Sequence, residues 1–320
     1  MGLLLIHQAL LHFRRGEFNR ASQLYEESIL VLRPVGDQVL LADALVFLGA
    51  ILHNFGEHER SRALEQEGLM IARQSDQRWL EAWAIFNLGY IDSLLGRAAH
   101  GYKQMQFGLN IWRALGDPHA IALGLNFQIP TLNQMGRLEE AKASMQESIA
   151  LCELSKNRWG MATAYRHLGL AYLASGECPQ ARAYLQKSLE MFGQFAQGWD
   201  IARSLTYLGD AALIDGDFQE ARKYYQDALQ CASSENLIPI ALDALLGMAE
   251  LLAHTGERLS ALVLCYFILE QASSEAGTKM RAEKLRVNVE SGLDPKRVAP
   301  AKAKAQEHTL DWFVKENLSG

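Results

Sequence analysis

The chain has 320 residues, of which 49% are hydrophobic, and it carries a net charge of −6 from 31 basic and 37 acidic residues. This balance argues against general binding to nucleic acid or to an anionic membrane, because both usually require a basic face. The length suits one extended array or two compact domains, and the apolar content is sufficient for a continuous core.

A glycine recurs every forty residues along most of the chain, with no insertion or deletion. The positions are Gly16, Gly56, Gly96, Gly136, Gly176, Gly216 and Gly256. A fixed period of this size is typical of a solenoid of stacked units. In the second unit one helix is expected over roughly 40–55 and another over roughly 59–73, joined by a glycine in the left-handed conformation. The sequence therefore predicts an all-α array of about seven antiparallel helix pairs over residues 1–270.

The fifth unit carries the most complete motif, which consists of Leu168-Gly169, Tyr172, Gly176, Ala181 and Leu185. This motif resembles the tetratricopeptide repeat, whose usual length is about 34 residues. The longer unit found here, with Leu115-Gly116-Asp117 near a joint, is similar to the repeat region of bacterial MalT-like and STAND transcriptional regulators.

The resemblance implies a right-handed superhelix in which the first helix of each unit lines a concave groove. It also implies a non-enzymatic scaffold or sensor that binds a protein or peptide, but it does not name the partner. No G-x-x-x-x-G-K-[ST] motif occurs, so no nucleotide cofactor is expected.

The first helix begins at Met1 without a capping residue, and Leu3, Leu4 and Ile6 make it look like an interior helix. We expect either that self-association or an upstream domain covers this end, or that the chain is part of a longer protein. The apolar start lacks the basic residues and cleavage site of a signal peptide. No apolar run reaches the roughly 18 residues of a membrane span, so no membrane partner is expected.

Repeat arithmetic places one group of side chains on the concave face as a candidate partner-binding site. The group comprises the aromatic stripe Trp83, Phe86 and Tyr90, the amides Asn126, Asn133 and Gln134, and the guanidinium groups Arg166 and Arg203. Rings would bury apolar side chains of a bound segment, amides would bond its backbone, and arginine would meet a carboxylate. The alternative is that the aromatic residues pack between helices, as most stripes at helical spacing do.

The fourth unit departs from the pattern, because Gln128-Ile129-Pro130 stands where other units have Leu-Gly. Proline within a helix removes a hydrogen bond and bends the helix, so Pro130 is either a hinge beside the groove or a tolerated defect.

Residues 271–320 read as a degenerate eighth unit followed by capping helices. Ala282 and Leu285 remain in register, whereas no turn glycine follows them. Trp312 and Phe313 are expected to cover the last apolar face, and the alternative is a loose tail.

No catalytic or metal-binding motif is found, and neither a cofactor nor a metal is expected. Asp210, Glu250 and His254 are the only acid–base group that the repeat brings together. Four scattered cysteines, Cys152, Cys178, Cys231 and Cys265, indicate reduced core thiols and a cytoplasmic protein. Three functions stay open: a binding scaffold, a peptide or small-molecule receptor that changes curvature, and a structural self-association module.

Overall fold

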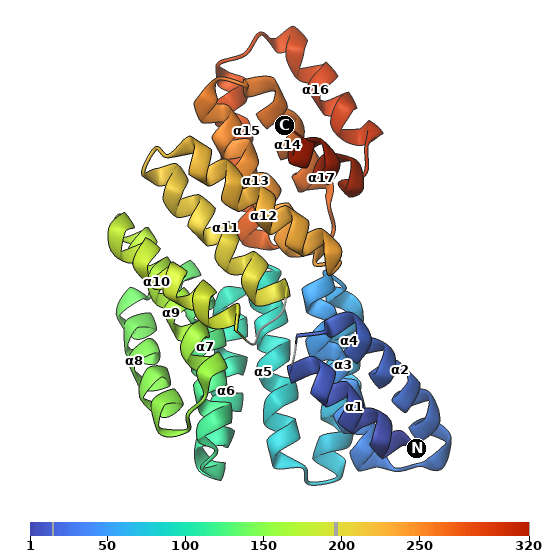
Figure 1. The fold of residues 1–320 in the computed structure, drawn as a ribbon. Coiled ribbons are helices and arrows are strands. Elements are labelled where there is room, and N and C mark those ends of the chain that lie inside the picture. The colour runs from blue at the N-terminus through green and yellow to red at the C-terminus, as the bar shows by residue number, and fades with distance from the viewer. Residues whose placement is uncertain (15, 195–197, 320) are drawn as a thin grey trace.

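The computed structural model describes residues 1–14, 16–194 and 198–319, and within these ranges its regular structure is entirely helical (Figure 1). The helices of the first four units are α1 (Gly2–Arg14), α2 (Phe18–Val35), α3 (Gln38–Leu52), the short 3₁₀ helix η1 (His53–Phe55), α4 (His58–Gln74), α5 (Arg78–Leu94), α6 (Ala98–Leu115), α7 (Pro118–Gln134) and α8 (Leu138–Leu154). Those of the remaining chain are α9 (Arg158–Ala174), α10 (Cys178–Phe192), α11 (Gly198–Ile214), α12 (Phe218–Ser234), α13 (Ile238–Thr255), α14 (Arg258–Glu270), α15 (Ala276–Ser291), α16 (Pro295–Glu307) and α17 (Leu310–Ser319).

Consecutive helices pack as pairs, and the pairs stack along the chain (Figure 1). Each odd-numbered helix from α3 to α13 also contacts the next odd-numbered helix, so the first helices of the units form one continuous layer. The predicted all-α solenoid is confirmed. The right-handedness of the superhelix stays a prediction.

The first four units and the sixth each have two left-handed turns, in keeping with their forty-residue register. The predicted turn glycines have positive φ angles, with Gly56 and Gly216 both at 79°. A second set lies at the joint to the next unit, at Gly36, Asp76, Gly116, Lys156 and Asn236. Asp, Asn and Lys pay a steric cost there that glycine avoids.

A glycine within the first helix of the unit, such as Gly89 on α5, lets the paired helices approach closely. A Cβ atom on Gly89 would lie 2.5 Å from the carbonyl oxygen of Gly101, so the α5–α6 pair admits no side chain at this point. In the fourth unit the fully buried Ile129 takes this place, and α7 continues through Pro130 to Gln134.

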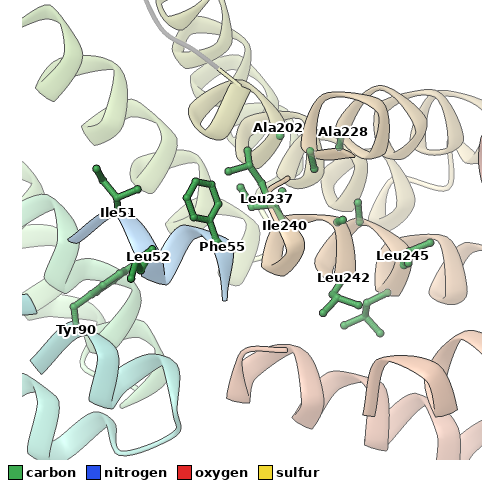
Figure 2. Close-up of a cluster of buried hydrophobic side chains, with 14 of the residues drawn as sticks. Ile51, Leu52, Phe55, Tyr90, Ala202, Ala228, Leu237, Ile240, Leu242 and Leu245 are labelled. Carbon is green, nitrogen blue, oxygen red and sulfur yellow. The ribbon is translucent and has the colours of Figure 1, made fainter. Parts of the chain in front are cut away.

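The stack of units curves until its two halves touch. Phe55, at the end of the second unit's first helix, is buried against the start of α13, where Leu237 and Ile240 lie (Figure 2). η1 and α13 are in contact, and one apolar core runs through both halves. This contact, between segments almost two hundred residues apart, closes the centre of the superhelix.

Beyond α14 the chain adds three helices that lie against the preceding units. α15 packs on α13 and α14, α16 on α14, and α17 on α12 and α13. Phe313 is buried with its ring 4.3 Å from that of Phe267, and Trp312 stacks on His308 at 3.8 Å. The division of the chain at residue 270 stays a prediction.

Two segments, Gln38–Phe55 and Ile238–Thr255, are as long and apolar as a membrane-crossing helix, with mean hydropathies of 1.6 and 1.3. The expectation that no segment reaches this length is therefore wrong. Most of each segment is buried inside the array, 72% and 67% respectively, as expected for core helices.

Candidate binding site at the centre of the superhelix

The aromatic stripe on α5 is packed between helices. Trp83, Phe86 and Tyr90 are 9%, 4% and 9% exposed. The Trp83 ring lies 5.2 Å from the ring of Phe47 on α3 and 5.9 Å from that of Trp112 on α6. These contacts match the packing alternative, and a partner-binding role for the stripe stays a prediction.

Tyr90 connects this stripe to the centre of the superhelix. Its ring meets the ring of His53 edge-on at 5.1 Å, and that of Phe127 at 5.5 Å. It thus supports η1, whose next residue is the turn glycine Gly56.

The side-chain amides of Asn126, Asn133 and Gln134 differ in how many hydrogen bonds they make within the chain. Asn126 is buried, donates to the carbonyl oxygen of Gly160 at 3.1 Å and accepts from the Ser148 hydroxyl at 2.9 Å. Gln134 is exposed and accepts from Ser93 at 3.3 Å. The buried Oδ1 of Asn133 has no hydrogen-bond partner among the described residues. Asn126 therefore joins units, whereas the other two retain unused bonding capacity.

Arg166 and Arg203 both lie close to one indole ring. Their guanidinium carbons are 4.9 and 5.5 Å from the centre of the Trp199 ring, a cation–π arrangement. Arg166 is only 1% exposed and donates to Asp200 Oδ1 at 2.7 Å. The other oxygen of Asp200 accepts from Trp159 Nε1 at 2.8 Å. The structure brings the two predicted arginines together, as the repeat register required.

Arg203 meets two carboxylates of its own chain. One guanidinium nitrogen donates to Asp243 on α13, and another donates to Glu275 Oε1 at 3.1 Å. The hydroxyl of Thr278 donates to the second oxygen of Asp243. The carboxylate that we expected a partner to supply to this arginine is thus supplied from within the chain.

Burial sets the charge states at this centre. It raises the pKa of Glu275, which Arg203 partly offsets, and it lowers the pKa of His53 to about 3. Burial also lowers the pKa of His167 well below its ordinary value. Burial lowers the pKa of Arg203, but the carboxylate of Glu275 raises it, and the net pKa lies above the ordinary value. The guanidinium therefore stays charged, whereas the imidazoles of His53 and His167 are neutral.

Sequence periodicity finds some of these groups and misses others. His53 and Asp243 stand on first helices at groove positions of the repeat, although nothing in the pattern pairs them with Tyr90 or Arg203. Glu275 was missed, because it lies where the repeat breaks down and no periodic position predicts its place.

The acid–base group suggested by the repeat is engaged by an arginine. Arg281 donates to Glu250 at 2.8 Å and to Asp210 at 3.4 Å, and the hydroxyl of Tyr225 donates to Asp210 at 2.8 Å. His254 instead stacks on Phe218. Within the described ranges, no three His, Cys, Asp or Glu side chains are placed to hold a metal ion, and the four cysteines are unpaired.

At the N-terminal end, the predicted apolar surface is only partly exposed. Leu3 and Leu4 are 47% and 57% exposed, whereas Ile6 is buried. Leu11, also on α1, is 58% exposed and extends the apolar surface formed by the two leucines.

Comparisons with known proteins agree with this repeat geometry. Two family models, both described as tetratricopeptide repeat, match residues 131–194 and 166–236. The chain contains tetratricopeptide repeats. No curated protein sequence matches the chain significantly.

Solved structures share the tetratricopeptide-repeat fold at low sequence identity. A Rap protein complexed with competence and sporulation factor is 15% identical, with a TM-score of 0.68 over 91% of this chain and 77% of that one. NprR in complex with its cognate peptide NprX is 14% identical, with a TM-score of 0.62 over 96% and 88%.

A STAND protein with a tetratricopeptide repeat sensor, from Pyrococcus horikoshii, is 15% identical with a TM-score of 0.50. The match covers 94% of this chain but spans only 44% of that protein.

Proposed function

We propose that this protein is a non-enzymatic, cytoplasmic scaffold that binds a peptide or protein segment at the centre of its superhelix. The observation that carries the proposal is the pair of buried arginines, Arg166 and Arg203, that both lie close to the ring of Trp199. Two charged side chains buried beside one indole form a costly arrangement for stability alone, and such arrangements concentrate at binding sites. Two neighbours of the same fold were solved with a ligand bound, the Rap protein with competence and sporulation factor and NprR with its cognate peptide NprX.

A second function, a receptor whose curvature changes on binding, is favoured by the closure of the centre. Phe55 is buried at the contact between the two halves, so a partner reaches Arg203 only after this contact loosens. Binding would then shift the molecule from a closed to a more open superhelix. Small-angle scattering would show a larger radius of gyration for the complex than is accounted for by the added segment.

A third function, self-association, is favoured by the exposed Leu3, Leu4 and Leu11 on α1. An apolar surface of this kind is typical of contact with a second chain or domain.

The proposed site can be tested with a photo-crosslinking amino acid at two tyrosines. Tyr207 lies at the centre, where its pKa is raised by burial and lowered by Arg203. Tyr184 lies on the second helix of its unit and stacks on Tyr172. We expect a partner to be captured in cell extract from position 207 and not from position 184. Equal capture at both positions, or capture at position 184 alone, would contradict the proposed site.

A further inference from the structure

The connector between α14 and α15, residues 271–275, follows a shortened helix. α14 has 13 residues, whereas α12, its counterpart in the preceding unit, has 17. The chain therefore leaves helical geometry early, with extended backbone at Gln271 (ψ 124°) and at Glu275 (ψ 153°). A connector of five residues results, extended at its two ends and folded into a turn between them, where the Ser274 N–H donates to the carbonyl oxygen of Gln271 at 3.2 Å.

This connector contacts units that are distant in sequence. A Cβ atom on Gly56 would lie 2.4 Å from that of Ser273, so the turn of the second unit rests directly on the connector. A Cβ on Gly96, in the third unit, would lie 3.1 Å from that of Ala276. Glu275 meets Arg203 in the sixth unit. The second and sixth units thus hold the connector between them, and the third unit contacts the residue that follows it.

The bonding of the connector is incomplete. The Ser274 side chain is 4% exposed, and its hydroxyl has no hydrogen-bond partner among the described residues. Arg203 shares its guanidinium between Glu275 and Asp243, which places two carboxylates against one cation. A segment held in this way is a replaceable occupant, because a better-matched carboxylate and backbone would satisfy the same groups.

Building on the proposed function, we propose that the connector is an internal ligand of the groove. The groove's partner is then an acidic peptide segment whose carboxylate takes the place of Glu275 on Arg203. Because the connector is covalently attached, its effective concentration is high, and the partner must compete with it.

The test uses the connector's own sequence as a probe, added as a separate molecule. The probe is a fluorescein-labelled peptide, QASSEAGTK, that copies residues 271–279, and its partner probe has glutamine in place of the glutamate. The proteins are the full-length wild type, Glu275→Gln and Glu283→Gln. Glu283 pairs with Arg286 on the exposed face of α15, so its variant controls for the loss of one acidic charge.

Fluorescence anisotropy is expected to show that Glu275→Gln binds the acidic probe at least tenfold more tightly than wild type does. Glu283→Gln is expected to match wild type, and the glutamine probe to bind Glu275→Gln at least tenfold more weakly than the acidic probe. Equal affinity for all three proteins, or no binding to folded Glu275→Gln as judged by circular dichroism, would overturn the inference.

The crosslinking experiment separates this inference from the function on which it rests. A partner captured from Tyr207 that the acidic probe does not displace would retain the proposed function and reject the internal ligand. Binding of the probe without any captured partner would retain the internal ligand and reject the proposed function.

Discussion

The turns at Gly56 and Gly216 have the same backbone conformation and different surroundings. Both glycines have φ of 79° and both end the first helix of their unit. A side chain on Gly216 would meet no atom within 4 Å, whereas one on Gly56 would collide with Ser273. The comparison separates what the forty-residue repeat determines, which is the local turn, from what the curvature of the whole array determines, which is the contact that covers the Gly56 turn and leaves the Gly216 turn open.

The largest effect is expected from removing the Tyr90 ring, which packs against His53 beside the Gly56 turn. Tyr90→Ala deletes a buried ring that contacts His53, and such truncations cost about 3–5 kcal/mol. Tyr172→Ala, which removes a half-buried ring stacked on Tyr184, is the matched control and is expected to cost far less. Chemical denaturation measures both.

From the sequence alone, alanine at Trp83 or Tyr90 is expected to weaken binding while the melting temperature changes by only a few degrees. The burial of both residues replaces that expectation with a large loss of stability. A Tyr90→Ala protein as stable as wild type would contradict the packing described here.

Alanine substitutions at the two turn glycines compare the covered turn with the open turn directly. Gly216→Ala should cost only the left-handed strain of a side chain, about 1–2 kcal/mol. Gly56→Ala carries the same strain and must also displace Ser273, so we expect it to cost about 1–3 kcal/mol more. Equal losses in urea denaturation would show that nothing covers Gly56 in solution.

Acid should weaken the covered turn. Burial lowers the pKa of His53 to about 3, below the ordinary value of 6.5, so the unfolded chain binds this proton first. The stability from His53 is complete above pH 6.5 and is lost as the pH falls toward 3, by about 1–2 kcal/mol between pH 6.5 and 5.

Asp43 acts in the opposite direction, because burial raises its pKa to about 6. The effect of His53 is therefore read from the difference between wild type and His53→Gln across this pH range. Parallel stability curves for the two proteins would contradict the assignment.

The smallest effect concerns the N-terminal end of the array. If Leu3 and Leu4 mediate self-association, Leu3→Glu with Leu4→Glu should convert a concentration-dependent dimer into a monomer without changing the fold. Leu154→Glu, at an 83% exposed leucine in the middle of the chain, is the control. Light scattering from a wild type that is monomeric at all concentrations would remove this function.

The sequence predicted the elements of the fold well because each unit is a local structure. The turn glycines, the close helix contact at Gly89 and the pairing of helices all follow from spacing within one unit. The same register placed Arg166 and Arg203 in one candidate site, and their role in binding a partner stays a prediction.

The closure could not be predicted in this way. It depends on the small rotation between successive units, which accumulates over the array until Phe55 reaches Leu237 (Figure 2). Glu275 lies in the connector, where the period is interrupted, so its meeting with Arg203 follows from tertiary curvature and from no repeat position.

Hydrogen–deuterium exchange on the full chain tests the central claim most directly, which is that the connector 271–275 and the turn 53–58 close the centre together. We expect both segments to exchange slowly in wild type, and both to exchange at least tenfold faster in Gly56→Ala but not in Gly216→Ala. A connector that exchanges at the unprotected rate in wild type, or a Gly56→Ala effect confined to its own turn, would contradict the account.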